Sequence, residues 1–216
     1  MTTAEQPPDR HRVATAVGLV ALVALVGLSA LVATGVTDAL DERVRELFRP
    51  GDHWGDLQMR VDLVVEGLRP PVTLVLLGLA TLVAAVARRS WWPLLSVGAT
   101  LGVLLALVTG LKLTVGRADT HGELGTLGGS YPSGHVATLL VAAGCVALLV
   151  RRRPGVLAWL LVALVTGVMA WALLVQTAHW FTDVLGGLLV GLVTLSVAVR
   201  LPFTRSGADV PVEAPR

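Results

Sequence analysis

The sequence has little charge and almost no cysteine. Only 15% of its 216 residues are Asp, Glu, Lys or Arg, whereas soluble domains carry about 25%. Hydrophobic residues make up 54% of the chain, and the mean hydropathy is +0.75. These values exclude an ordinary soluble domain and indicate an integral membrane protein. The single cysteine, Cys145, lies inside an apolar run and excludes a disulfide within the chain.

Six apolar stretches are long enough to cross a hydrocarbon core of about 30 Å as helices. Because every backbone polar group must be satisfied within lipid, we interpret them as helices rather than buried strands. The first stretch is also too long for the apolar region of a cleaved signal peptide. The stretches are residues 13–36, 71–87, 91–111, 133–150, 155–175 and 181–200. The predicted fold class is all-α, a polytopic membrane protein whose six transmembrane helices form a bundle.

This bundle is expected to occupy residues 13–205. Residues 1–12 and 206–216 are polar and contain proline, so we predict disordered termini. The net charge of +2 does not indicate a nucleic-acid partner, because the basic residues punctuate apolar runs. Four groups of arginines at the ends of the stretches all fall on one side, which the positive-inside rule places in the cytoplasm. They are Arg10, Arg12, Arg88, Arg89, Arg151, Arg152, Arg153, Arg200 and Arg205.

Both termini are then cytoplasmic, in a multi-pass protein of the plasma membrane, and the polar segment 37–69 is extracytoplasmic. Leu57, Val61, Val64 and Leu68 recur there at helical spacing and predict an amphipathic helix. Two interpretations of this segment are open. It is either a solvated connector, which we favour, or a lid over a site.

Titratable and phosphate-compatible residues stand where predicted helices meet the extracytoplasmic face. Ser133 and Gly134 mark a helix start, where free N–H groups attract phosphate, and His135 lies one turn in. His179 and Asp183 are four residues apart, so a carboxylate can fix the tautomer of an imidazole. Taken alone, these are also compatible with an ordinary helix cap and a structural His–Asp pair.

Two cations lie just upstream, at the end of the third stretch. Lys112 and Arg117 could simply reach toward lipid headgroups, as helix-end cations often do. Ionisable residues are costly in a membrane, however, and here they converge on one level from three helices. The set therefore predicts a phosphate site.

The pattern resembles the membrane branch of the type-2 phosphatidic acid phosphatase and haloperoxidase superfamily. The matching motifs are Lys112…Arg117, then Pro132-Ser133-Gly134-His135, then His179-x-x-x-Asp183. By this resemblance, His179 would be the nucleophile, Asp183 would orient it, and His135 would protonate the leaving oxygen. Lys112, Ser133 and Gly134 would bind phosphate oxygens, with no metal and no cofactor.

The resemblance implies a lipid phosphate phosphatase that acts at the outer face through a phosphohistidine intermediate. Its partners would be membrane lipids and a lipid phosphate substrate. The substrate would be a phosphomonoester or diphosphate of the phosphatidate, phosphatidylglycerol phosphate or polyprenyl diphosphate class.

The sequence departs from the family at two arginines. The first motif of the family has Arg-Pro where this chain has Asp119 and Thr120, and the third has Ser-Arg where it has Ala172 and Leu173. We expect Arg117 to replace one missing phosphate ligand. If ligands alone are missing, Asp119→Arg with Leu173→Arg should raise activity. The alternative is a degenerate, non-hydrolytic member that binds lipid phosphates or serves as a membrane scaffold.

Overall fold

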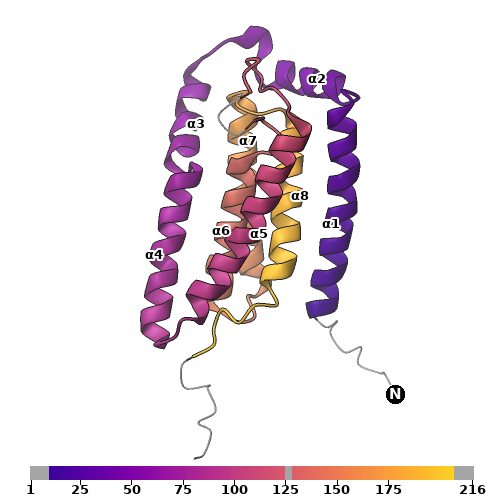
Figure 1. The fold of residues 1–216 in the computed structure, drawn as a ribbon. Coiled ribbons are helices and arrows are strands. Elements are labelled where there is room, and N and C mark those ends of the chain that lie inside the picture. The colour runs from indigo at the N-terminus through magenta and orange to yellow at the C-terminus, as the bar shows by residue number, and fades with distance from the viewer. Residues whose placement is uncertain (1–9, 125–127, 207–216) are drawn as a thin grey trace, which may run out of the picture.

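The computed structural model describes residues 10–124 and 128–206. In these residues the regular secondary structure is all helical, with eight α-helices and one short 3₁₀ turn (Figure 1). The elements are α1 (Arg10–Ala33), α2 (Asp38–Phe48), η1 (Pro50–Asp52), α3 (Asp56–Gly67), α4 (Pro70–Arg88), α5 (Trp92–Val115), α6 (Gly134–Val150), α7 (Val156–Val175) and α8 (Phe181–Ala198). Each predicted apolar stretch corresponds to one long helix.

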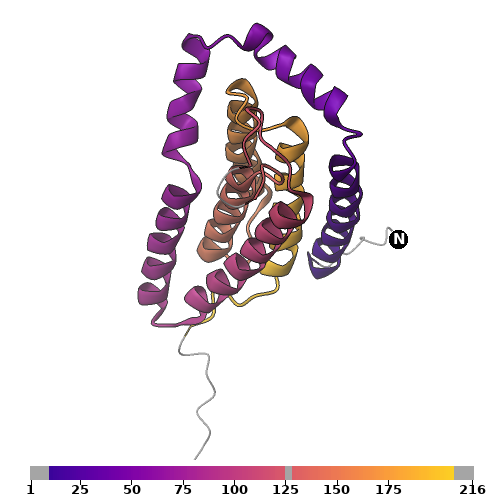
Figure 2. The ribbon, with the colours of Figure 1, turned by 45° about the horizontal axis from the view of Figure 1, so that its top comes forward.

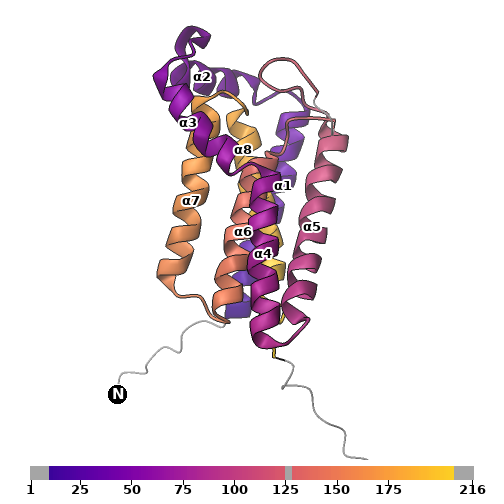
Figure 3. The same ribbon diagram turned by 90° about the vertical axis from the view of Figure 1, so that its left-hand side faces the viewer.

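The six long helices run side by side as a bundle, with α2 and η1 at one end (Figures 1 and 3). Helix α8 packs against α1, α5 and α6, and α6 also packs against α4 and α7. With the top of the molecule tilted forward, α1 and α4 lie on opposite sides (Figure 2). Helices α6 and α8, which carry the sequence motifs, therefore lie where other helices hold them on several sides.

Five helices, α1, α4, α5, α7 and α8, are long and apolar enough to cross a membrane. Helix α6 is apolar too, and at 17 residues it is slightly shorter than these five. Large apolar side chains face outward from the bundle: Val20, Val23, Val83 and Leu157 are each 68–73% exposed. An exposed aliphatic surface of this kind is suited to lipid rather than to water. The chain is a multi-pass membrane protein.

Two glycines bring α8 unusually close to α6. A Cβ on Gly187 would lie 2.6 Å from the Ser133 carbonyl oxygen, and one on Gly191 would lie 2.5 Å from a methyl carbon of Leu140. No side chain fits at either distance without a shift of its neighbours. The close approach fixes the start of α8 beside the start of α6.

The segment between α1 and α4 differs from its prediction. It contains two α-helices, and α3 has one buried face as expected, but this face consists of Gln58, Val61 and Val65, so it shares only Val61 with the expected stripe. Leu57 is instead 49% exposed. The valines pack against the apolar side of α7, and this packing selects the buried face. Most of the segment is exposed, as expected of a solvated connector, but Asp41 of α2 and the buried face of α3 pack against the bundle.

The predicted termini need one correction. Helix α1 begins at Arg10, so residues 10–12 are helical rather than disordered. The expectations for residues 1–9 and 207–216 lie outside the described residues.

Candidate active site

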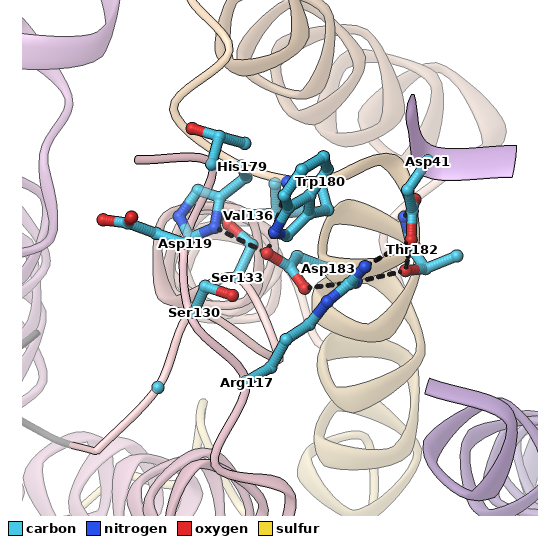
Figure 4. A network of polar contacts seen from close by, with 12 residues as sticks. Asp41, Arg117, Asp119, Ser130, Ser133, Val136, His179, Trp180, Thr182 and Asp183 are labelled. Atoms are coloured by element: carbon cyan, nitrogen blue, oxygen red, sulfur yellow. Dashed lines mark hydrogen bonds and ion pairs between the residues drawn. The ribbon is translucent and has the colours of Figure 1, made fainter. Parts of the chain in front are cut away.

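The end of the bundle that carries α2 also holds the sequence motifs. Lys112 is in the last turn of α5, His135 is in the first turn of α6, and Asp183 is in the first turn of α8. Helix and loop segments converge there around His179 (Figure 4). The structure thus brings together side chains that lie up to 71 residues apart, between Lys112 and Asp183.

His179 and Asp183 face each other across the start of α8. The imidazole Nδ1 lies 3.4 Å from Asp183 Oδ2, and the backbone N–H of Trp180 donates to the same oxygen at 3.2 Å. The Asp183 side chain is fully buried, and that of His179 is 12% exposed. Because Nδ1 faces the carboxylate, Nε2 lies on the opposite edge of the ring. This orientation suits an imidazole that attacks through Nε2.

The start of α6 is tied to α8 by Ser133. Its backbone N–H donates to the Asp183 carbonyl at 2.9 Å, while its hydroxyl accepts the N–H of Val136 at 3.5 Å as a helix cap. The cap leaves His135 in the first turn, with its ring centroid 5.9 Å from that of His179. The rings stand edge to face, with 67° between their planes. The two imidazoles are therefore neighbours at this end of the bundle.

Gly134 is partly exposed at this helix start. A Cβ built on it would have no described atom within 4 Å. The backbone here faces open space, and the first N–H groups of a helix carry a partial positive charge. An anion could therefore approach the N-terminus of α6 directly.

Lys112 turns toward the loop that precedes α6. Its ammonium donates to the carbonyl of Gly129 and, at 3.4 Å, to that of Ser130. An ammonium has three N–H donors, so one remains for a phosphate oxygen. Its position is compatible with the expected role.

Arg117 has partners that the sequence did not suggest. Its guanidinium donates to Thr182 Oγ1 at 2.7 Å, Asp183 Oδ1 at 3.2 Å and Asp41 Oδ2 at 2.7 Å (Figure 4). A further contact reaches the exposed Asp38 at 3.4 Å. The guanidinium is thus directed at protein carboxylates. This geometry does not support the expectation that Arg117 substitutes for a missing phosphate ligand.

The positions of the two missing arginines are filled by groups with structural roles. Asp119 Oδ1 accepts the N–H groups of His121 and Glu123 at 2.8 and 2.9 Å, so the carboxylate closes its own turn. Thr120 donates its hydroxyl to the Thr177 carbonyl. Ala172 and Leu173 are fully buried in the apolar cluster between α7 and its neighbours.

Sequence reasoning missed Asp41, Thr182 and Arg49. The Arg49 guanidinium donates to the Gln176 carbonyl at 2.9 Å and to Thr177 Oγ1 at 2.8 Å, and so supports the loop before His179. Nothing in the spacing of the acidic segment singled out Asp41 from its neighbours. In the described residues, no group of three or more His, Cys, Asp or Glu side chains could hold a metal ion.

Tyr131 supports the loop directly before the Pro-Ser-Gly-His motif. The side chain is completely buried, and a 3.0 Å hydrogen bond joins its hydroxyl to Ser29 of α1. Burial raises the pKa of the Tyr131 phenol, which keeps the hydroxyl protonated for this bond. The ring also lies against Gly186 of α8, where a Cβ would come within 2.5 Å of Cε2.

We therefore expect Gly186→Ala to displace Tyr131 and lower both stability and activity. Overpacking of this kind costs about 1–3 kcal/mol. Gly98→Ala on the outer face of α5 is the matched control, because a Cβ there meets no described atom within 4 Å. Thermal unfolding of the two purified variants checks the stability difference, with the lower melting temperature expected for Gly186→Ala. Equal melting temperatures would show that Tyr131 does not constrain Gly186.

Comparison with known proteins agrees with the motifs. A family model described as the PAP2 superfamily matches residues 93–206. Among solved structures, the chain is similar to a transmembrane PAP2-type phosphatidylglycerolphosphate phosphatase from Bacillus subtilis, with a TM-score of 0.70 and 20% identity. That match covers 85% of this chain and 94% of the other. At this identity the likeness shows the fold. No curated protein matches the sequence.

Proposed function

The chain belongs to the PAP2 superfamily, and from this premise we propose that it hydrolyses a phosphomonoester or diphosphate of a membrane lipid. The observation that carries the proposal is the placement of His179 between the buried carboxylate of Asp183 and the ring of His135. Such a set provides a nucleophile, a group that orients it, and an acid. The substrate would be of the phosphatidate, phosphatidylglycerol phosphate or polyprenyl diphosphate class.

In the first step, Nε2 of His179 attacks the terminal phosphorus, and the bond from this phosphorus to the oxygen of the departing lipid, or of the departing lipid phosphate in a diphosphate, breaks. His135, whose ring borders that of His179, gives a proton to that departing oxygen. The negative oxygens of the transferred phosphoryl group lie at Lys112 and at the free N–H groups beside Ser133 and Gly134. Charge-assisted hydrogen bonds of this kind are the strong ones. Asp183 holds the proton on Nδ1 and stabilises the charged ring.

In the second step, water attacks the phosphohistidine and gives a proton to His135. The bond between phosphorus and nitrogen breaks, inorganic phosphate leaves, and His179 is neutral again. The acid of the first step is thus the base of the second. Atoms and protons balance over the cycle.

The proposal is tested by phosphate release from a lipid panel. Purified protein in detergent micelles is given phosphatidate, phosphatidylglycerol phosphate and a polyprenyl diphosphate, each with a matched dephosphorylated lipid as the blank. We expect release from at least one of them without added metal. Absence of release from all three would contradict the proposal.

The second candidate is a non-hydrolytic protein that binds lipid phosphates. It is favoured by the groups that fill the two arginine positions, and by the carboxylates around Arg117. A transition-state arginine can contribute about 10³–10⁵ in rate, so its loss could abolish turnover. Saturable binding of the same lipids without phosphate release would favour this candidate.

We also propose six transmembrane passes, with both termini cytoplasmic and the site outside. The arginine groups between helices support this orientation, because the segment 37–69 holds eight acidic residues against five arginines. With the buried Cys145 first replaced by alanine, His53→Cys beside η1 should react with an impermeant thiol reagent in intact cells. His53 is exposed and, unlike Gly51, has a negative φ.

The matched control is Gly155→Cys, which is exposed in the turn at the other end of the bundle. It should react only after the cells are permeabilised. If Gly155→Cys were labelled in intact cells and His53→Cys were protected, the orientation in the membrane would be the opposite of the one proposed.

A further inference from the structure

Asp41 of α2 is a buried carboxylate outside the region that the family model matches. Its Oδ1 accepts the backbone N–H of Thr182 at 2.9 Å, and its Oδ2 accepts the Thr182 hydroxyl at 2.7 Å (Figure 4). Arg117 adds an ion pair of 2.7 Å to Oδ2. Thr182 is the residue directly before Asp183, so α2 is attached at the catalytic end of α8.

Arg117 connects this carboxylate to the catalytic one. Its side chain is 11% exposed, those of Asp41 and Asp183 are not exposed at all, and its guanidinium lies 5.1 Å from the centre of the Trp180 ring. Buried carboxylates need a charged partner and hydrogen bonds to remain ionised. One guanidinium with several N–H donors provides this for both.

Because Arg117 contacts Asp183, the two carboxylate oxygens of Asp183 have separate partners. Oδ1 faces Arg117, and Oδ2 faces His179 Nδ1 and the Trp180 N–H. The carboxylate plane is therefore held from both sides, which fixes the direction in which Oδ2 meets the imidazole. A carboxylate whose only partner was His179 could rotate away from the imidazole.

We propose that Asp41 and Arg117 form a positioning pair that holds Asp183, and through it His179, in the attacking orientation. The inference rests on the proposed function and deepens it. Arg117 acts through Asp183 rather than by binding phosphate, and α2 becomes a part of the active site. Exposed Asp38, 3.4 Å from Arg117 and 69% exposed, adds little, because exposed ion pairs are weak.

The test compares Asp41→Asn, Arg117→Lys, Arg117→Gln and the double variant Asp41→Asn with Arg117→Gln. The matched control is Glu42→Gln, the same type of change at an exposed neighbour on α2. For each, kcat, KM and competitive inhibition by inorganic phosphate are measured on the best lipid of the panel. Amounts are normalised to folded protein by size exclusion and thermal unfolding.

We expect Asp41→Asn to lower kcat about 10- to 100-fold, the range typical for the loss of an outer partner of an active group. In both Asp41→Asn and Arg117→Lys, KM and the inhibition constant of phosphate should stay close to the wild-type values. Lysine keeps the charge but cannot bridge two carboxylates with a planar fork. The double variant should be no worse than Arg117→Gln alone, because the amide removes the unpaired buried charge that the single change leaves.

Several outcomes would overturn the proposal while the proposed function stands. One is that the Asp41→Asn variant has the same kcat as the control variant Glu42→Gln. Another is a rise in KM and in the phosphate inhibition constant for both Arg117 variants with kcat unchanged, as expected of a phosphate ligand. Strictly additive losses in the double variant would also contradict a pair that acts as a unit. If wild type releases no phosphate from any lipid, the proposed function fails, and positioning for catalysis fails with it.

Discussion

His179→Ala should abolish phosphate release altogether. The proposed reaction forms a bond between phosphorus and Nε2, and no other group of the site can replace a missing nucleophile. Among the described residues, the Asp183 carboxylate contacts His179 at Nδ1, and the ring of His135 lies 5.9 Å from that of His179 between centroids. We expect turnover to fall to the level of the lipid blank in the phosphate-release assay.

The control for this change is His53→Ala, an exposed histidine at the same end of the bundle. It should keep wild-type activity. A His179→Ala protein that still released phosphate at the wild-type rate would show that the nucleophile is elsewhere.

His135→Ala should have a smaller effect that depends on the leaving group. A departing alkoxide of a lipid needs a proton, whereas a nitrophenolate leaves without one. The variant should therefore be slow on the lipid and nearly normal on a nitrophenyl phosphate. An equal loss on both substrates would indicate that His135 acts as something other than the acid.

The helices of the bundle could be predicted because lipid allows few alternatives. The stretches 71–87 and 133–150 became α4 (Pro70–Arg88) and α6 (Gly134–Val150), with shifts of one residue. Proline and serine fix these starts locally, at Pro70 and at the Ser133 cap. Local chemistry and the need for internal hydrogen bonds are both present in the sequence.

The contact between His179 and Asp183 was predicted, but its geometry was not: His179 lies in the bend before α8, and Asp183 reaches back to it as it does to the Trp180 N–H at the helix start. The pairing of Arg117 with Asp41 could not be predicted from the sequence. The two residues are 76 apart, and Asp41 stands in a segment with seven other acidic residues. Which of these is buried depends on how α2 lies across the start of α8, and periodicity within α2 does not contain that information. The misassignment of the buried face of α3 has the same origin, since α7 selects it.

The two missing arginines allow a prediction with a large effect on stability. From the sequence, arginines at 119 and 173 were expected to restore phosphate ligands and raise activity. The structure argues against this at Leu173, which is fully buried against the apolar cluster of Val136, Met169 and their neighbours. A guanidinium there would be a buried charge without a partner, which typically costs several kcal/mol.

We therefore expect Leu173→Arg to unfold or aggregate the protein, and the double change with Asp119→Arg to give no active enzyme. Asp119→Arg alone should be milder, because it removes two hydrogen bonds within a partly exposed turn, each contributing about 1 kcal/mol. Leu173→Met is the control at the buried position, since volume-conserving changes cost less than about 1.5 kcal/mol. Thermal unfolding and size exclusion separate these variants. A folded Leu173→Arg protein with raised activity would mean that α7 can turn this position toward the phosphate, and the site would then lack a ligand that the fold is still able to accommodate.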